Sequence, residues 1–157
     1  MIGGHLLEPV VIPGRLNSES FLNLLENDLP VLLEDIPLEA RREIWFQLDG
    51  CPVHSSRRVR QWLNTKYPEQ WIGRYGPSEW PARSPDLTPL DFYVWGRLKT
   101  LVYSEPVNTR NELVEKIFTK CNDMRRNRGE IRRAGDAVLK RSRLCRIEGG
   151  GNFEHLL

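Results

Sequence analysis

The chain has 157 residues, of which 39% are hydrophobic and 28% charged, and its formal net charge is +2. This composition is typical of a globular protein, and no apolar run approaches the roughly 20 residues of a membrane helix, so a membrane span is excluded. A chain of this length can bury about two-thirds of its unfolded surface, so one domain is the first expectation.

The N-terminal residues and the cysteines predict an intracellular protein. Residues 1–16 lack the basic start and the continuous apolar stretch of a secretory signal peptide. The three cysteines are widely spaced, and an odd number suits reduced thiols better than a disulfide framework. They are Cys51, Cys121 and Cys145.

The first predicted elements are a strand and a helix. Residues 6–12 alternate loosely between apolar and polar before a Pro-Gly turn, which predicts a strand. Residues 18–35 carry leucines at helical spacing, with Asn17 or Ser18 as the N-cap. Pro30 lacks a backbone donor, so the helix is expected to kink or restart there.

A buried strand and an amphipathic helix are predicted next. The β-branched and aromatic run at residues 44–48 ends at Asp49 and a glycine, which indicates a strand with a polar tip. Residues 55–67 place apolar side chains on one stripe of a helix, largely away from four basic residues. These basic residues are Arg57, Arg58, Arg60 and Lys66.

The second half of the chain is predicted to be helical after an irregular stretch. Residues 73–86 are rich in Gly, Pro and Ser, with at most one short strand. Thr88 to Asp91 and Thr109 to Glu112 have capping-box spacing and mark two helix starts. A last helix is expected around residues 130–144, before the glycines of residues 148–152.

Basic residues gather in the helix at 55–67 and in the C-terminal fifth of the chain. A local basic surface can attract phosphate groups even when the whole chain is nearly neutral. The alternative is an ordinary solvated helix face, and charge alone slightly favours it.

Asp49 and Asp91 are the candidate metal ligands. Two converging carboxylates can hold Mg²⁺, and a third would allow a pair of ions about 4 Å apart. Each aspartate also has an ordinary explanation, because an acid before a glycine is common in turns and an acid in the first helical turn stabilises the helix. Spacing alone leaves these explanations ahead.

Two long segments resemble known sequence motifs. Residues 46–54 (FQLDGCPVH) and 80–99 (WPARSPDLTPLDFYVWGRLK) are similar to the second and third acid motifs of mariner-type transposases of the DDE/D superfamily, in an insect-type branch. Residues 12–22 and 150–157 also resemble such proteins.

The resemblance implies an α/β fold, specifically a ribonuclease H-like domain with a small sheet and flanking helices. It is expected to be truncated and to lack the first strand, with the partial catalytic domain at residues 1–147 and a C-terminal tail at residues 148–157. Asp49 then corresponds to the second catalytic acid and Asp91 to the third. His54 corresponds to a family histidine that supports the site, although a surface or packed histidine fits equally well. Cys51-x-x-His54 alone is too little for a zinc site.

By the same resemblance, the intact relatives are Mg²⁺-dependent enzymes that cut and join DNA at transposon ends in the nucleus, and act as dimers. The first acid and the upstream DNA-binding helices are expected to be absent from this sequence. A site lacking one central ligand generally loses orders of magnitude in rate, so we expect weak metal binding and no efficient catalysis by this chain alone. The alternatives are a host-retained nucleic-acid-binding or interaction module, and an enzyme that takes its missing carboxylate from an upstream segment.

The five tryptophans divide into two groups by position. Trp45, Trp62 and Trp95 lie on apolar stripes and are expected in the core. Trp71 and Trp80 lie in or near the irregular stretch, where they could contact a partner or DNA.

Overall fold

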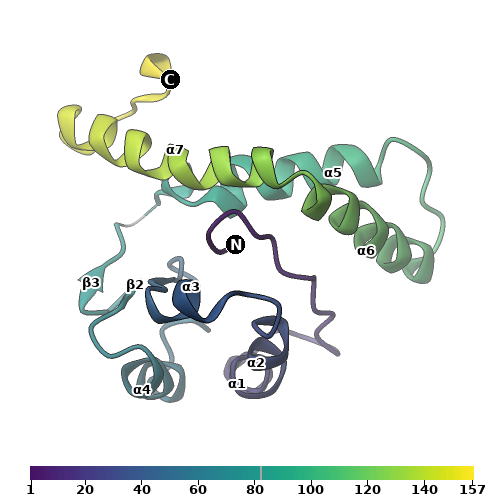
Figure 1. Cartoon of the computed structure of the whole chain (residues 1–157), viewed down its shortest axis with the longest axis horizontal. Helices are drawn as coiled ribbons and strands as arrows, with labels where there is room; N and C mark the ends of the chain where they lie inside the picture. Colours follow the sequence, from purple (N-terminus) through teal and green to yellow (C-terminus); the bar gives the residue numbers. More distant parts are fainter. Residues whose placement is uncertain (82) are drawn as a thin grey trace. The chain divides into compact units, whose positions relative to one another are not determined.

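The computed structural model describes residues 1–81 and 83–157, and these form two compact units (Figure 1). The sheet unit consists of Val10–Arg83. The helical unit combines Met1–Pro9 with Ser84–Leu157. The expected domain boundary between residues 147 and 148 stays a prediction.

A small parallel sheet forms the centre of the sheet unit. Its strands are β1 (Phe46–Gln47), β2 (Trp71–Gly73) and β3 (Ser78–Glu79), in the order β1-β2-β3. The Leu48 N–H extends the β1–β2 pairing with a 2.8 Å bond to the Ile72 carbonyl. The predicted strand at residues 44–48 is therefore confirmed, although it is shorter than its apolar run.

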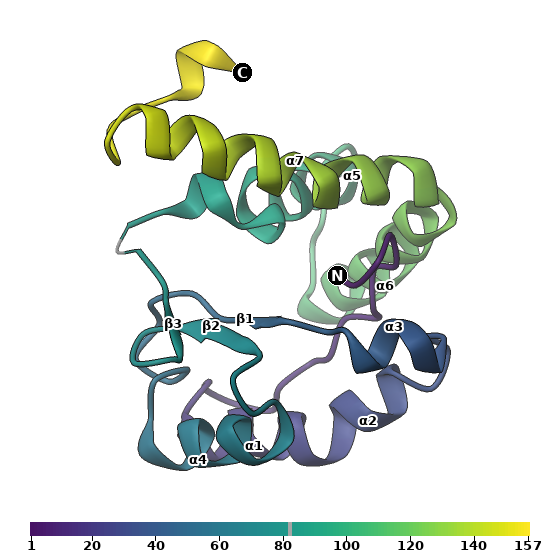
Figure 2. The ribbon, with the colours of Figure 1, turned by 60° about the vertical axis from the view of Figure 1, so that its left-hand side comes forward.

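Along the chain, four helical segments precede β1, and a fifth lies between β1 and β2. They are α1 (Ser18–Asn23), the π-helical segment η1 (Leu24–Asp28), α2 (Leu29–Leu32), α3 (Leu38–Arg42) and α4 (Arg57–Lys66). Figure 2 shows α1, α2 and α4 on the same side of the sheet. The Asn17 side chain accepts bonds from two backbone N–H groups of α1, and Pro30 lies in the first turn of α2. The predicted cap is confirmed. The helix does not break at the proline but changes from a π-helical to an α-helical segment at Leu29, one residue before it.

The core of the sheet unit joins α4 to the strands. Val59 and Leu63, one turn apart on α4, are fully buried, and Trp71 in the central strand is 1% exposed. The Trp71 Nε1–H donates a 2.9 Å bond to Asn64 Oδ1, which satisfies its one polar group. The suggestion that Trp71 meets a partner is therefore wrong, because its ring is part of this core.

The core positions predicted for two other tryptophans are also wrong. Trp45 is 54% exposed and Trp95 47% exposed, although both were expected in the core. Each lies on an apolar stripe of the sequence, but such a stripe does not reveal which of its members finds a packing partner. Trp62 is half-buried and its ring centroid lies 5.9 Å from that of Tyr67.

Two long helices, α6 and α7, and four shorter helical segments make up the helical unit. It contains η2 (Pro85–Leu87), the π-helical segment η3 (Leu90–Trp95), α5 (Gly96–Val102), α6 (Arg110–Arg126), α7 (Arg128–Ile147) and η4 (Glu154–Leu156). The predicted helix starting after Thr109 is confirmed, since Thr109 Oγ1 accepts a 3.1 Å bond from the Glu112 N–H. The helix predicted at residues 130–144 is also confirmed and is longer than expected. No helix among the described residues is long and apolar enough to cross a membrane.

The N-terminal segment of the helical unit is not the predicted strand. Residues 6–12 have no regular secondary structure, and the nearest ladder is an isolated bridge between Ile2 and His5. Leu6 instead packs in the cluster of α5, α6 and α7, and Glu8 forms an ion pair with Arg125 of α6. An extended segment lying on helices has the same alternation as a strand, which explains the error.

Candidate metal and nucleic-acid site

Asp49 lies directly after β1, where the chain turns toward α4. Its Oδ1 accepts a 3.0 Å bond from the Cys51 N–H, so the carboxylate closes a turn with the backbone two residues ahead. The side chain is 50% exposed. A half-exposed carboxylate at the end of a buried strand is available to a ligand while its position is fixed.

His54 is the second partner of Asp49. Its Nδ1 lies 2.6 Å from Asp49 Oδ1, and its side chain is only 18% exposed. The imidazole packs against Phe21 of α1, with 4.5 Å between ring centroids. The contact with α1 holds the ring against the carboxylate, which is the arrangement expected of a supporting residue.

Cys51 brings a third possible metal ligand to the same loop. One ligand atom from each of Asp49, Cys51 and His54 can be chosen so that all three lie within 4.8 Å of one another. The sequence analysis considered the cysteine and histidine as a pair and did not include the aspartate. The spacing Asp-x-Cys-x-x-His within six residues was the signal that could have revealed the cluster.

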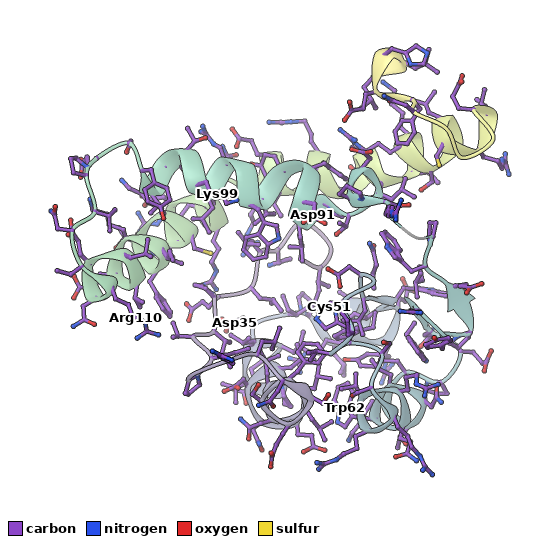
Figure 3. All side chains as sticks on the ribbon, turned by 180° about the vertical axis from the view of Figure 1, so that it is seen from behind. Asp35, Cys51, Trp62, Asp91, Lys99 and Arg110 are labelled. Carbon is purple, nitrogen blue, oxygen red and sulfur yellow. The ribbon has the colours of Figure 1, made fainter. Side chains whose placement is uncertain are left out.

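Asp91 belongs to the helical unit. Its backbone N–H donates a 3.0 Å bond to the Thr88 carbonyl at the start of η3, and its side chain is exposed. Figure 3 shows Asp91 and Lys99 on the same helical stretch of the chain, η3 followed by α5. Asp49 and Asp91 lie in different units, so their convergence at one metal site stays a prediction.

The basic residues of α4 form the candidate contact surface for DNA. Arg57, Arg58 and Lys66 are exposed, whereas Arg60 is half-buried. None of the four forms an ion pair within residues 1–81 and 83–157. Their charge is therefore available to an external anion.

The Tyr75 ring contacts two arginine side chains, those of Arg60 and Arg74. The guanidinium carbon of Arg60 lies 5.2 Å from the centroid of the Tyr75 ring, and that of Arg74 lies 5.1 Å from it. The Tyr75 side chain is 58% exposed and its φ is +67°, a left-handed conformation that is unfavourable for a bulky residue. The ring thus draws two cations together by cation–π attraction. The sequence analysis did not identify either Arg74 or Tyr75.

The positive charge of the C-terminal helices is compensated in part by ion pairs. Arg125 pairs with Glu8, and Arg132 lies 4.0 Å from Asp136 one turn along α7. Arg141 stacks over Phe92, 4.0 Å from the ring centroid. The basic surface on α4 is therefore the better candidate for contact with phosphate groups.

Comparisons with known proteins relate the chain to transposases. No protein-family profile matches it. It is 31% identical over 99 residues to the "Transposable element Tc3 transposase" of Caenorhabditis elegans, a match that covers 63% of this chain and 27% of the relative. The chain thus matches about a quarter of that relative's length.

Solved structures of the Mos1 transposase catalytic domain share the fold. The structure with Raltegravir and Mg matches with a TM-score of 0.72 and 20% sequence identity. The match covers 90% of this chain and 67% of the Mos1 chain. The structure with Mn has a TM-score of 0.71 and 19% identity, and covers 90% and 68%. These matches confirm the predicted ribonuclease H-like fold, here with a small open three-stranded parallel sheet and flanking helices. The assignment to an insect-type branch stays a prediction. The chain is thus similar in sequence to part of a Tc3 transposase and similar in fold to the Mos1 transposase catalytic domain, as the resemblance to mariner-type transposases predicted.

Proposed function

We propose that this chain is part of a cut-and-paste DNA transposase in which Asp49 and Asp91 are metal ligands and α4 contacts DNA. The observation that carries the proposal is the position of Asp49. It is a half-exposed carboxylate, fixed by two hydrogen bonds, at the end of a parallel strand in a ribonuclease H-like unit. A solved catalytic domain with this fold was determined with Mg.

The residues around Asp49 fit a hard divalent cation. Both hydrogen bonds of its carboxylate use Oδ1, so we assign Oδ2 to the metal. Carboxylate oxygens are the protein ligands that Mg²⁺ prefers, and bound Mg²⁺ would stabilise negative charge on a phosphate. His54 would orient the carboxylate without binding Mg²⁺ itself.

The basic residues of α4 would bind the phosphate backbone. Arg57, Arg58, Arg60 and Lys66 supply positive charge without sequence readout, and affinity should fall steeply as salt rises. Arg74, held beside Arg60 by Tyr75, extends this surface along the sheet unit.

We propose that the chain by itself binds DNA but does not cleave it efficiently. A pair of ions requires ligands that bridge them, and two carboxylates hold such a pair less well than three. Binding of Mg²⁺ is expected to be weak for the same reason. The second candidate function is a non-catalytic nucleic-acid-binding or interaction module. It is favoured by the basic residues of α4, which form no ion pair with any residue that the structure describes.

Action on DNA would place the chain in the nucleus, with the cytoplasm as the alternative. Assembly into a homodimer stays a prediction based on the resemblance to transposases.

One pair of assays tests these proposals. The purified chain is incubated with labelled duplex DNA, and binding and nicking are measured with and without Mg²⁺. We expect Arg57→Glu together with Arg58→Glu to lower affinity at least about tenfold at low salt, because two favourable phosphate contacts become repulsive. The matched control is Arg15→Glu with Arg42→Glu, two exposed arginines of the same unit. Equal affinity for both double variants would contradict the DNA-binding role.

The nicking assay separates the remaining alternatives. Mg²⁺-dependent nicking that disappears in both Asp49→Asn and Asp91→Asn would show an active site assembled from these two acids. Binding without nicking, unaffected by either variant, would favour the non-catalytic module. Nicking that persists in both variants would show that the proposed ligands are wrong.

A further inference from the structure

We infer that Asp49, Cys51 and His54 form a binding site for a thiophilic divalent cation, with Zn²⁺ as the best match. The inference shares Asp49 with the proposed function but depends neither on Asp91 nor on DNA. It goes beyond a magnesium site because two of the three ligands are a thiol and an imidazole.

The three side chains converge from a single short loop. Their ligand atoms lie within 4.8 Å of one another. Tetrahedral Zn²⁺ with bonds of about 2.0–2.3 Å separates its ligands by roughly 3.3–3.8 Å. The 2.6 Å contact between His54 Nδ1 and Asp49 Oδ1 must therefore open by roughly 1 Å. Rotation of the half-exposed Asp49 side chain would open this contact, at the expense of the bond between its Oδ1 and the Cys51 N–H.

The backbone of the loop already holds the ligands in place. The His54 N–H donates a 3.0 Å bond to the Cys51 carbonyl, which fixes the backbone between these two ligands. Packing of the His54 ring against Phe21 restricts its rotation. A cation would therefore order few additional groups on binding, which favours affinity.

The ligand types distinguish Zn²⁺ from Mg²⁺. Thiolate and imidazole suit Zn²⁺, whereas Mg²⁺ takes oxygen ligands. Three protein ligands leave a fourth tetrahedral position for water or an external group. Zn²⁺ at this site would engage the carboxylate that we assign to Mg²⁺, so the two metals should compete for Asp49.

The test uses the complete chain in a thiol-free reductant with excess Mg²⁺. Zn²⁺ binding is measured by calorimetry, and Co²⁺ is used as a spectroscopic probe because a cobalt–thiolate bond gives a charge-transfer absorption band. We expect one equivalent of metal and a cobalt–thiolate band. Cys51→Ala should abolish the band and weaken Zn²⁺ binding at least about tenfold. The control Cys145→Ala removes a half-buried thiol of α7 and should change neither.

Circular dichroism of both variants must match the parent chain, and Cys51→Ser provides a second, smaller change if Cys51→Ala does not fold. Unchanged Zn²⁺ affinity in the Cys51 variants, or loss of the band only in Cys145→Ala, would overturn the inference. Such a failure would leave the DNA-binding proposal intact, because that proposal is tested by the α4 variants in the absence of metal.

Discussion

The Tyr93 hydroxyl donates a 2.7 Å hydrogen bond to Glu130 Oε2, and thereby joins η3 to the first turn of α7 across 37 residues of sequence. Burial, together with this bond, raises the pKa of Tyr93 to about 12. Tyr93 follows Asp91 by two residues in η3. The bond therefore ties the segment that carries a proposed metal ligand to the longest helix of its unit.

Removal of this bond should destabilise the helical unit. We expect Tyr93→Phe to lower the free energy of unfolding by about 1 kcal/mol, since the partly buried Glu130 carboxylate loses its donor. Urea denaturation followed by circular dichroism measures the change. Tyr103→Phe, at a side chain that is 63% exposed, is the matched control and should have little effect. Equal stabilities of the two variants would show that the bond contributes nothing.

Because Trp71 is buried, its substitution should lower the free energy of unfolding more than the substitution of Tyr93 does. Trp71→Phe removes the indole N–H that bonds Asn64 and leaves a small cavity, so we expect a loss of about 1–3 kcal/mol. Trp45→Phe makes the same change at a side chain that is 54% exposed and should cost far less. Chemical denaturation measures the free energy of unfolding of both variants. A greater loss of stability in Trp45→Phe than in Trp71→Phe would contradict the packing described above.

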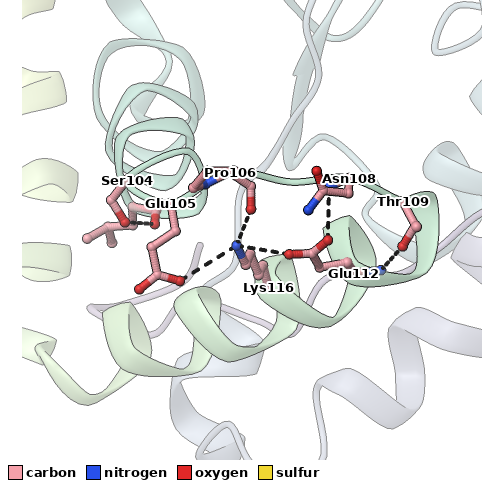
Figure 4. A network of polar contacts seen from close by, with 8 residues as sticks. Ser104, Glu105, Pro106, Asn108, Thr109, Glu112 and Lys116 are labelled. Atoms are coloured by element: carbon pink, nitrogen blue, oxygen red, sulfur yellow. Dashed lines mark hydrogen bonds and ion pairs between the residues drawn. The ribbon is translucent and has the colours of Figure 1, made fainter.

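Acid should weaken the start of α6 through Glu112. Figure 4 shows its carboxylate accepting a bond from the Asn108 N–H and pairing with Lys116. The Asn108 backbone bond, followed by the bond to Lys116, holds the pKa of Glu112 below its usual value of 4.5. The stability that these contacts add is thus complete above pH 4.5 and is lost as the pH falls through the lower pKa of the folded state.

Glu112→Gln should therefore be less stable than the parent chain at pH 7, and this difference should shrink in strong acid. Thermal unfolding measured from neutral to strongly acidic pH gives the comparison. Glu115→Gln, on an exposed position of the same helix, should show no such trend. A difference that grows as the pH falls would have the wrong sign for this mechanism.

The three thiols should differ in reactivity. Burial raises the pKa of the Cys121 thiol, whereas Cys51 and Cys145 are only partly buried. Since the thiolate is the reactive form, Cys121 should be alkylated by iodoacetamide more slowly than the other two. Peptide mass spectrometry over time measures each rate. If Cys121 reacts fastest, its burial between the N-terminal segment and the helices is incorrect.

Local patterns predicted most helices correctly. The caps at Asn17 and Thr109 depend on side chains and backbone groups only a few residues apart. Such interactions can be recognised in sequence because the two partners are always close along the chain. The ribonuclease H-like fold was predicted from resemblance, since the alternation of predicted strands and helices suggested only an α/β layer architecture.

One failure is local, because Pro89 and not Thr88 is the N-cap of η3 and no side chain caps that segment. The other failures concern contacts between distant residues. Residues 6–12 have the alternation of a strand but no regular secondary structure, and residues 6–8 instead contact the helices of the helical unit. Trp45 and Trp95 lie on apolar stripes but remain exposed, while Trp71 is buried by the central position of its strand. Periodicity shows that one side of a segment is apolar, but it does not show what covers that side.

By itself, the sequence determined where most helices occur, the two aspartates worth testing and the resemblance to transposases. Only the tertiary structure decided that the His54 ring is held by Phe21 against Asp49, with the Cys51 thiol nearby. It also decided that Tyr75 gathers Arg60 and Arg74. The physical reason is that capping acts over one helical turn, whereas the convergence of side chains depends on how the whole backbone folds.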